Sequence, residues 1–114
     1  MIVVYTPEFR RDLRAEKSYY IKHNAAQYAN EIAQRLLTAC AGLKKSPNSG
    51  RSAAERFGID TDMKYLVVER YMIFFRVEAN AVEVVRLFNT QTNILFHLFG
   101  VDTTDLESEA YWGE

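Results

Sequence analysis

The chain has 114 residues, of which 48% are hydrophobic, 25% are charged and one is a cysteine. This length suits a single domain with one core, and the composition is too hydrophobic for a disordered chain. An internal disulfide is excluded because Cys40 has no partner, and its setting in LLTACAGL indicates a buried, unreactive side chain. No apolar run approaches the ~20 residues of a membrane span, and MIVVYTPEF lacks the pattern of a secretion signal, so we expect a cytoplasmic protein with no membrane partner.

The formal net charge of −1 conceals an uneven distribution. All fourteen Lys and Arg residues lie within residues 1–101, where ten acidic residues leave an excess of +4. The remaining five acidic residues lie within residues 102–114, which contain no basic residue. The basic excess is modest for a nucleic-acid binder, which usually depends on a dense basic patch.

The first elements expected are a strand and a helix. Residues 2–5 (IVVY) are β-branched or aromatic and predict a short strand. Thr6 then predicts a helix start, because its side chain can accept a free backbone N–H and because Pro7 needs no donor at the first helical position. We expect this helix to run to about His23, with an apolar stripe on one side and most of its basic residues outside it.

A second helix is expected to follow directly. Asn24 and Gln27 have the spacing of a capping box, in which two side chains satisfy backbone N–H groups at a helix start. Apolar residues then recur at helical spacing as far as Leu43, which makes this the clearest periodic segment of the chain. The segment SPNSG ends the helix, and we expect a polar loop from there to about Asp62.

Three apolar segments after this loop predict an antiparallel meander. Residues 63–69, 71–77 and 82–88 are rich in β-branched and aromatic side chains and are joined by short connections. If both connections are two-residue turns, Arg76 and Glu83 become cross-strand partners.

The same register gives the sheet two mostly apolar faces. Phe88 shares one face with Phe75, and Leu87 shares the other with Phe74. An antiparallel sheet with one face in water normally alternates apolar and polar residues, so each face here needs a cover. The two helices supply one cover, and the other requires the C-terminal segment or a second chain. The pattern leaves open which face the helices take.

The end of the chain predicts further helical structure. Residues 89–93 (NTQTN) are polar and uncharged, and we expect them to end the sheet, with Thr90 or Thr92 as the cap of a short helix over residues 93–99. Residues 104–107 have the pattern of another capping box ahead of apolar and aromatic residues. We therefore expect a domain over residues 1–100 and an acidic extension over residues 101–114, docked as a helix in preference to a loose tail.

Three stretches carry a resemblance to a known family. They are YTPEFRRDLRAEKSYYIKHN in the first helix, LKKSPNSGR at the end of the second, and YLVVERYMIFFRVEANAVEVVRLF in the meander. Together they cover about residues 1–93 and resemble the RelE/ParE superfamily of toxins from bacterial type II toxin–antitoxin (plasmid stabilisation) modules. The resemblance implies an α+β fold with an N-terminal strand and an α-helical hairpin packed on a small antiparallel β-sheet. Residues from Val101 onward match no part of the family pattern.

The resemblance also implies a growth-inhibiting toxin that is neutralised by a cognate antitoxin protein lying across its surfaces. Apolar and aromatic residues usually anchor such interfaces. The predicted partner-binding residues are Tyr65, Val67, Met72, Phe74, Leu87 and Arg51, with Tyr65, Met72 and Phe74 as the first choices. An alternative stays open, in which the apolar residues of this set are core beneath the helices and Arg51 makes a hydrogen bond that organises its loop.

The mRNA-cleaving branch of the superfamily uses basic residues on its strands and an Arg with a Tyr or His beyond the last strand. Here Met72 occupies one of the strand positions, and Gln91 and Thr92 stand where the Arg is expected. Neutral side chains cannot neutralise the charge that develops on a phosphate during cleavage. The remaining catalytic candidates are Lys64, Arg86 and His97. As alternatives, Lys64 and Arg86 are solvated residues at the sheet edge, and His97 is a histidine packed in the core.

This departure favours the ParE-like branch, which implies a toxin that binds a protein, with DNA gyrase as the implied target, and not an enzyme. Two alternatives remain open. One is a RelE-like, ribosome-dependent mRNA endonuclease, and the other is an inactive, toxin-derived domain that binds a partner or forms a homodimer. No cofactor is expected, and no metal either, because His23 and His97 have no Cys or carboxylate at ligand spacing.

Overall fold

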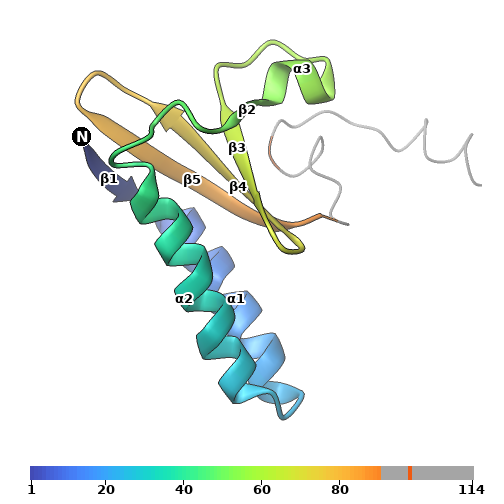
Figure 1. The fold of residues 1–114 in the computed structure, drawn as a ribbon. Coiled ribbons are helices and arrows are strands. Elements are labelled where there is room, and N and C mark those ends of the chain that lie inside the picture. Colours follow the sequence, from blue (N-terminus) through green and yellow to red (C-terminus); the bar gives the residue numbers. More distant parts are fainter. Residues whose placement is uncertain (91–97, 99–114) are drawn as a thin grey trace, which may run out of the picture.

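A computed structural model of the chain describes residues 1–90 and residue 98. Figure 1 shows a helical hairpin that projects from a single sheet. The expected α+β class, with an N-terminal strand and a helical hairpin on a small sheet, is confirmed. In chain order the elements are β1 (Ile2–Tyr5), α1 (Pro7–Lys22), α2 (Ala26–Gly42), β2 (Arg51–Ser52), α3 (Ala53–Phe57), β3 (Lys64–Val68), β4 (Tyr71–Val77) and β5 (Ala81–Asn89).

The sheet has five strands in the order β1-β5-β4-β3-β2. The meander formed by β3, β4 and β5 is antiparallel as expected, and Arg76 lies opposite Glu83 with 3.8 Å between Nη1 and Oε1. β1 runs parallel to β5 and pairs only with its first half, from Ala81 to Val84. The sheet is therefore mixed, and the second half of β5 has no strand beside it on that edge among the described residues.

A β-bulge in the β4–β5 pair changes the register that the turns imply. Phe75 lies opposite Val84, but the preceding residue of β4 lies opposite Arg86, so β5 holds one extra residue at this point. Because side chains alternate between the two faces of a sheet, the extra residue moves every later side chain of β5 to the other face. The expected register is therefore wrong beyond Val84, and the structure places Leu87 on the helix-covered face and Phe88 on the opposite one.

Local hydrogen bonds fix both ends of α1. The Phe9 N–H donates to Thr6 Oγ1 at 3.0 Å, which confirms the predicted helix start. At the other end Asn24 adopts a φ of 60°, and the Ala25 N–H donates to the Tyr20 carbonyl at 2.8 Å, as in a Schellman motif. Asn24 thus ends the first helix instead of starting the second. The predicted capping box is wrong, and α2 begins with no side-chain cap.

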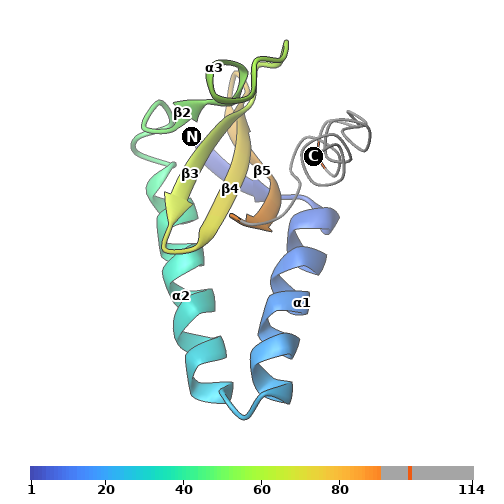
Figure 2. The ribbon, with the colours of Figure 1, turned by 90° about the vertical axis from the view of Figure 1, so that its right-hand side faces the viewer.

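The helical hairpin covers the face of the sheet that carries Ile73 and Phe75, and Figure 2 shows both helices extending beyond the strands to a shared tip. The periodic apolar stripe predicted for α2 is confirmed, and Cys40 lies fully buried within it. Burial raises the pKa of the Cys40 thiol to about 12 and so keeps the thiol protonated. The buried residues of this first core are Phe9, Ile32, Leu36, Cys40, Leu43, Tyr71, Ile73, Phe75, Val82, Val84 and Leu87.

The opposite face is covered by α3, within the segment expected to be a polar loop. The Glu55 N–H donates to Ser52 Oγ at 3.2 Å at the start of this helix, and Gly58 ends it with a φ of 67°. The Ser52 to Glu55 spacing is a cap signal, and it could have revealed the helix. The buried residues of this second core are Ala53, Met63, Tyr65, Met72, Phe74 and Phe88, with Phe57, Val85 and Leu98 packed against them.

The predictions for the end of the chain lie outside the described residues. They concern Gln91 and Thr92, His97, the short helix over 93–99 and the extension over 101–114. Leu98 is described, and it packs against the second core. In the part of the chain that the structure describes, no helix is long and apolar enough to cross a membrane.

Candidate protein-binding surface

Four predicted partner anchors lie inside the protein. The exposed fractions of Tyr65, Met72 and Phe74 are 3%, 1% and 0%. The Phe57 ring of α3 lies 6.4 Å from the Tyr65 ring and 6.2 Å from the Phe74 ring, so the short helix closes over both. Leu87 lies in the first core, where the bulge places it. These four side chains are core, and Tyr65 also lines a surface hollow.

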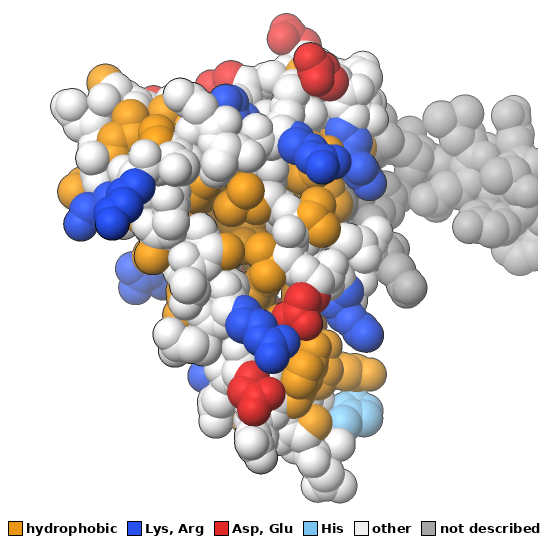
Figure 3. Space-filling view, in the orientation of Figure 1, with side chains coloured by type: hydrophobic (Ala, Val, Ile, Leu, Met, Phe, Trp, Pro, Cys, Tyr) orange, Lys and Arg blue, Asp and Glu red, His pale blue; other side chains and the backbone are white. Residues whose placement is uncertain are grey.

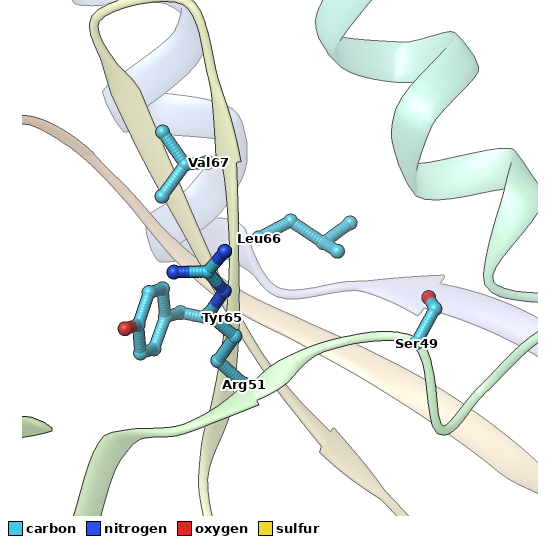
Figure 4. Close-up of a pocket in the computed structure, with 5 residues that line it drawn as sticks. All are labelled: Ser49, Arg51, Tyr65, Leu66 and Val67. Atoms are coloured by element: carbon cyan, nitrogen blue, oxygen red, sulfur yellow. The ribbon is translucent and has the colours of Figure 1, made fainter. Parts of the chain in front are cut away.

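The other two predicted contacts, Arg51 and Val67, are exposed and line one hollow. Val67 has an exposed fraction of 53%. Arg51 lies opposite Tyr65 in the β2–β3 pair, so their side chains share a face of the sheet. Figure 4 shows Arg51, Tyr65 and Val67 extending to one side of β3 and Leu66 to the other. The hollow has a volume of about 370 Å³ and is lined by Ser49, Arg51, Tyr65, Leu66 and Val67.

The main chain beside this hollow forms an open strand edge. β2 pairs with β3 only through Arg51 with Tyr65 and Ser52 with Lys64. Because β2 has two residues, no other described strand runs along the outer edge of residues 66–68. Free N–H and C=O groups on a strand edge can pair with a strand supplied by another chain. The edge therefore offers main-chain hydrogen bonds beside an apolar contact at Val67.

A second arginine extends the surface toward α3. The Arg56 guanidinium carbon lies 5.6 Å from the centres of both the Phe57 and the Tyr65 rings, within the range of cation–π attraction. A second open hollow of about 500 Å³ lies here, and Figure 3 shows basic side chains beside hydrophobic ones in this part of the molecule. Its lining residues are Gly50, Arg51, Ser52, Glu55, Arg56 and Tyr65.

The catalytic candidates Lys64 and Arg86 are not brought together. Lys64 Nζ donates to Asn48 Oδ1 at 3.5 Å on the β2 side of the sheet. Arg86 forms a bidentate pair with Asp12 of α1, at 2.7 Å from Nε and 3.1 Å from Nη2. Its guanidinium also lies 4.5 Å from the centre of the Phe88 ring. Both groups thus have intramolecular partners on different sides of β4, and His97 lies outside the described residues.

Asp12 has a second role at the same place. One of its oxygens, Oδ2, also accepts the Leu87 N–H at 3.0 Å, in the half of β5 that has no described strand beside it on the β1 side. A carboxylate that satisfies a guanidinium and a backbone donor together is a strong, geometrically specific contact. This Asp12–Arg86 contact therefore attaches α1 to the edge of the sheet.

The tip of the hairpin presents apolar side chains that sequence reasoning did not single out. Tyr19 and Ile21 have exposed fractions of 56% and 53%. The His23 ring lies 4.3 Å from the Tyr19 ring. The residues Tyr19 and Ile21 fall off the buried stripe of α1, and that off-stripe position is the signal that could have marked them.

Comparison with known proteins identifies the family. The family model described as "ParE toxin of type II toxin-antitoxin system, parDE" matches residues 3–94, which covers every strand and helix from β1 to β5 apart from the first residue of β1. The chain belongs to the ParE toxin family. The expected assignment to the ParE-like branch of the toxin–antitoxin superfamily is thereby confirmed. Toxins of this family are described as one component of a two-component system, with an antitoxin as the other.

A solved structure agrees with this fold. It is a chain of a chromosomal ParDE TA system from P. aeruginosa, with a TM-score of 0.67 and 19% sequence identity. The match covers 78% of this chain and 95% of that chain. No curated protein matches the chain. At this identity the structural match supports the ParE fold alone.

In this ParE toxin the loop PNSGR, at the end of the stretch LKKSPNSGR, has a packing function. A Cβ atom added at Gly50 would lie 2.4 Å from Cζ of Phe75 and 3.1 Å from the Tyr65 carbonyl oxygen. The loop therefore passes too close to the first core for any larger residue, and Arg51 is held at the sheet edge as a result. The segment that carried the family resemblance thus positions one of the two exposed contact residues.

A tyrosine network joins the ParE helices to the sheet. The Tyr71 hydroxyl donates to Glu16 Oε2 at 3.0 Å and lies 3.0 Å from the Tyr20 hydroxyl. Burial and this hydrogen bonding raise the pKa of Tyr71, so the phenol stays neutral. The three residues come from α1 and from the start of β4, and their contact fixes the hairpin against the meander.

Proposed function

We propose that this ParE toxin acts by binding DNA gyrase, with no chemistry of its own, and that a cognate ParD-like antitoxin neutralises it. The support for a toxin of this kind is membership of the ParE family. The support for binding over catalysis comes from the charged groups of the described residues.

The observation that carries the proposal is the engagement of Arg86. A nuclease needs a cation that is free to stabilise the negative charge developing on a scissile phosphate. Arg86 is the basic residue nearest the end of β5, and its guanidinium is held by both oxygens of Asp12. The side chains of this pair are only 26% and 17% exposed, so replacing the carboxylate with a phosphate would require an attached helix to move. A binding role needs no such rearrangement.

We propose the open edge of β3 as one contact of the antitoxin. An extended antitoxin segment can continue the sheet beside residues 66–68, with an apolar side chain against Val67 and an acidic one against Arg51. The hairpin tip, with Tyr19 and Ile21 exposed, offers a separate apolar surface for a helical segment. Of the six predicted partner-binding residues, Val67 and Arg51 are the two that this proposal keeps as direct contacts.

Controlled expression tests the proposed activity. The protein is induced alone and together with its neighbouring antitoxin gene, while growth, transcript integrity and plasmid supercoiling are followed. We expect growth arrest with altered supercoiling and intact transcripts, relieved by the antitoxin. Arrest with specific transcript cleavage would instead establish the ribonuclease alternative and end the gyrase proposal. Good expression with normal growth would favour the inactive, partner-binding alternative.

A matched pair of valine variants tests the proposed contact. Val67→Asp places a charge at the open β3 edge, and Val4→Asp places one on β1, at the opposite edge of the sheet, where the side chain is 44% exposed. We expect Val67→Asp to weaken antitoxin binding at least tenfold, measured by titration calorimetry, because an apolar contact is lost and a like charge faces an acidic segment. Val4→Asp should bind as the unmodified chain does. Equal affinity for both variants would place the antitoxin elsewhere.

A further inference from the structure

Two arginines on the second face have no acidic partner among the described residues. Of the described arginines, Arg35, Arg76 and Arg86 form ion pairs, whereas no carboxylate pairs with Arg51 or Arg56. Glu55 lines the hollow between these two, yet it forms no ion pair with either. We name the patch formed by the exposed side chains of Arg51, Arg56 and Val67, together with the almost buried Tyr65 between them, the arginine surface. It combines two guanidinium groups with aromatic and apolar side chains.

The last described residue before the acidic end of the chain, Leu98, lies at this same face. Leu98 packs against the second core, to which Tyr65 of the arginine surface also belongs. The first acidic residue beyond it is Asp102, and Glu109 is the fourth of the five that follow Leu98. At most ~3.6 Å per residue, segments of this length span roughly 13 to 40 Å, which is ample to cross one face of a small sheet. Residues 102–114 contain no basic residue to compete for these carboxylates.

We propose that the acidic segment 101–114 docks on the arginine surface of its own chain. Guanidinium groups bind carboxylates through two parallel hydrogen bonds, which suits a segment rich in Asp and Glu. The contact is intramolecular, so the tether supplies an effective concentration on the order of millimolar, enough to occupy a weak exposed site. The segment also carries Tyr111 and Trp112, whose rings can cover Val67.

Docking of this kind regulates access to the β3 edge. A partner that uses Arg51 and Val67 must first displace the acidic segment, so the segment lowers the affinity of every such partner by the same factor. The inference requires neither gyrase nor an antitoxin, and it stands or fails independently of the proposed function.

Trp112 provides a direct probe, because it is the only tryptophan of the chain. Acrylamide quenching of its fluorescence in the purified full-length protein measures whether the segment is covered. We expect Arg51→Glu/Arg56→Glu to raise the quenching constant about twofold or more, toward that of free tryptophan. In the unmodified protein, 0.5 M NaCl should raise it in the same direction, because salt screens exposed charge pairs. Arg11→Glu/Arg14→Glu, with the same charge change on the exposed side of α1, should leave the constant unchanged.

A second variant controls for the possibility that Arg51→Glu/Arg56→Glu misfolds. Glu107→Lys/Glu109→Lys alters the segment alone, and it should release Trp112 to the same extent while leaving the body of the protein intact by circular dichroism. Combining it with Arg51→Glu/Arg56→Glu restores opposite charges and should restore protection. Quenching that is equal in the unmodified protein and both double variants would overturn the proposal. Protection that disappears on dilution would also overturn it, by placing the segment on a second copy of the chain.

Discussion

The two faces of this one sheet carry cores of different construction. The first core lies beneath α1 and α2, two helices of 16 and 17 residues, whereas the second lies beneath α3, a helix of five residues. A single helical turn has almost no stability by itself, because helix nucleation fixes many dihedral angles for few hydrogen bonds. The second core therefore depends on side-chain packing to hold its cover, and it should be the softer region. The arginine surface and the open β3 edge both border this softer side.

Adjacent phenylalanines give the sharpest test of this difference. Phe74 and Phe75 are neighbours in β4, both are fully buried, and they point into opposite cores. We expect Phe75→Ala to lower the free energy of unfolding by about 4–5 kcal/mol and Phe74→Ala by about 3 kcal/mol, because α3 can collapse onto the smaller cavity. Urea denaturation measures both. A larger loss for Phe74→Ala would reverse the comparison.

The Asp12–Arg86 contact should be the next largest effect. Asp12→Ala leaves Arg86 and the Leu87 N–H without their acceptor in a half-buried place, and we expect a loss of about 2–3 kcal/mol. Arg35→Ala is the matched control, because its ion pair with Glu69 joins side chains that are 55% and 40% exposed. It should lower the free energy of unfolding far less than Asp12→Ala does, because solvent screens an exposed ion pair. Similar losses for the two variants would remove the distinction between a helix attachment and a surface ion pair.

Glycine substitutions separate the crowded loop from an open helix end. Gly50→Ala forces a methyl group into Phe75 and the Tyr65 carbonyl, and we expect a loss of about 1–3 kcal/mol by thermal or urea unfolding. Gly42→Ala meets no atom within 4 Å at the end of α2 and should stabilise the protein by about 0.5–1 kcal/mol. If Gly50→Ala were neutral, the loop could not be held against the first core as described.

Alkaline pH should weaken the first core through Cys40. Its pKa is raised by burial from 9.0 to about 12, so the unfolded chain loses the thiol proton before the folded one does. The stabilisation of the folded state by the protonated Cys40 thiol is therefore fully present below pH 9. It is lost as the pH rises from about 9 to about 12, at about 1.4 kcal/mol of unfolding free energy per pH unit. The difference in unfolding free energy between the unmodified protein and Cys40→Ala should shrink across this range. A difference independent of pH would show that the thiol is not buried in the folded state.

The smallest expected effect is confined to the second core. Ser52→Ala removes the side-chain cap of α3, and we expect a cost of about 0.5–1 kcal/mol. Because α3 opens separately from the hairpin, amide hydrogen exchange should accelerate over residues 53–57 while the exchange in α2 stays unchanged. Uniform acceleration in both helices would mean that the two cores unfold as one unit.

The fold could be predicted from the sequence where local signals were unambiguous. Thr6 followed by Pro7 marks the start of α1, and apolar periodicity marks α2, since both depend on neighbouring residues alone. The sequence does not decide the role of Asn24, because an asparagine favours both a helix N-cap and the left-handed conformation that ends a helix, and the choice depends on backbone geometry. Ser52 was overlooked because five helical residues show no periodicity.

The candidate site was less predictable, because it depends on pairings between distant residues. The bulge arises from the pairing between β4 and β5, and no residue of the turn predicts it. The register that the turn implies therefore puts Leu87 on the wrong face. Arg86 and Asp12 are 74 positions apart, and their contact forms only when α1 lies along β5. The sequence predicts Tyr65, Met72 and Phe74 as partner anchors because it predicts a loop in place of α3, the helix that covers their face. Arg51 and Val67 remained exposed because β2 ends after two residues.

The central claim, that this ParE toxin works by binding gyrase and not by cleaving RNA, is tested most directly by DNA supercoiling with purified gyrase in the presence of the full-length chain. The account predicts inhibition that increases with toxin concentration and is reversed by the antitoxin, with added mRNA left intact on translating ribosomes. Normal supercoiling at saturating toxin, together with cleaved mRNA, would contradict it.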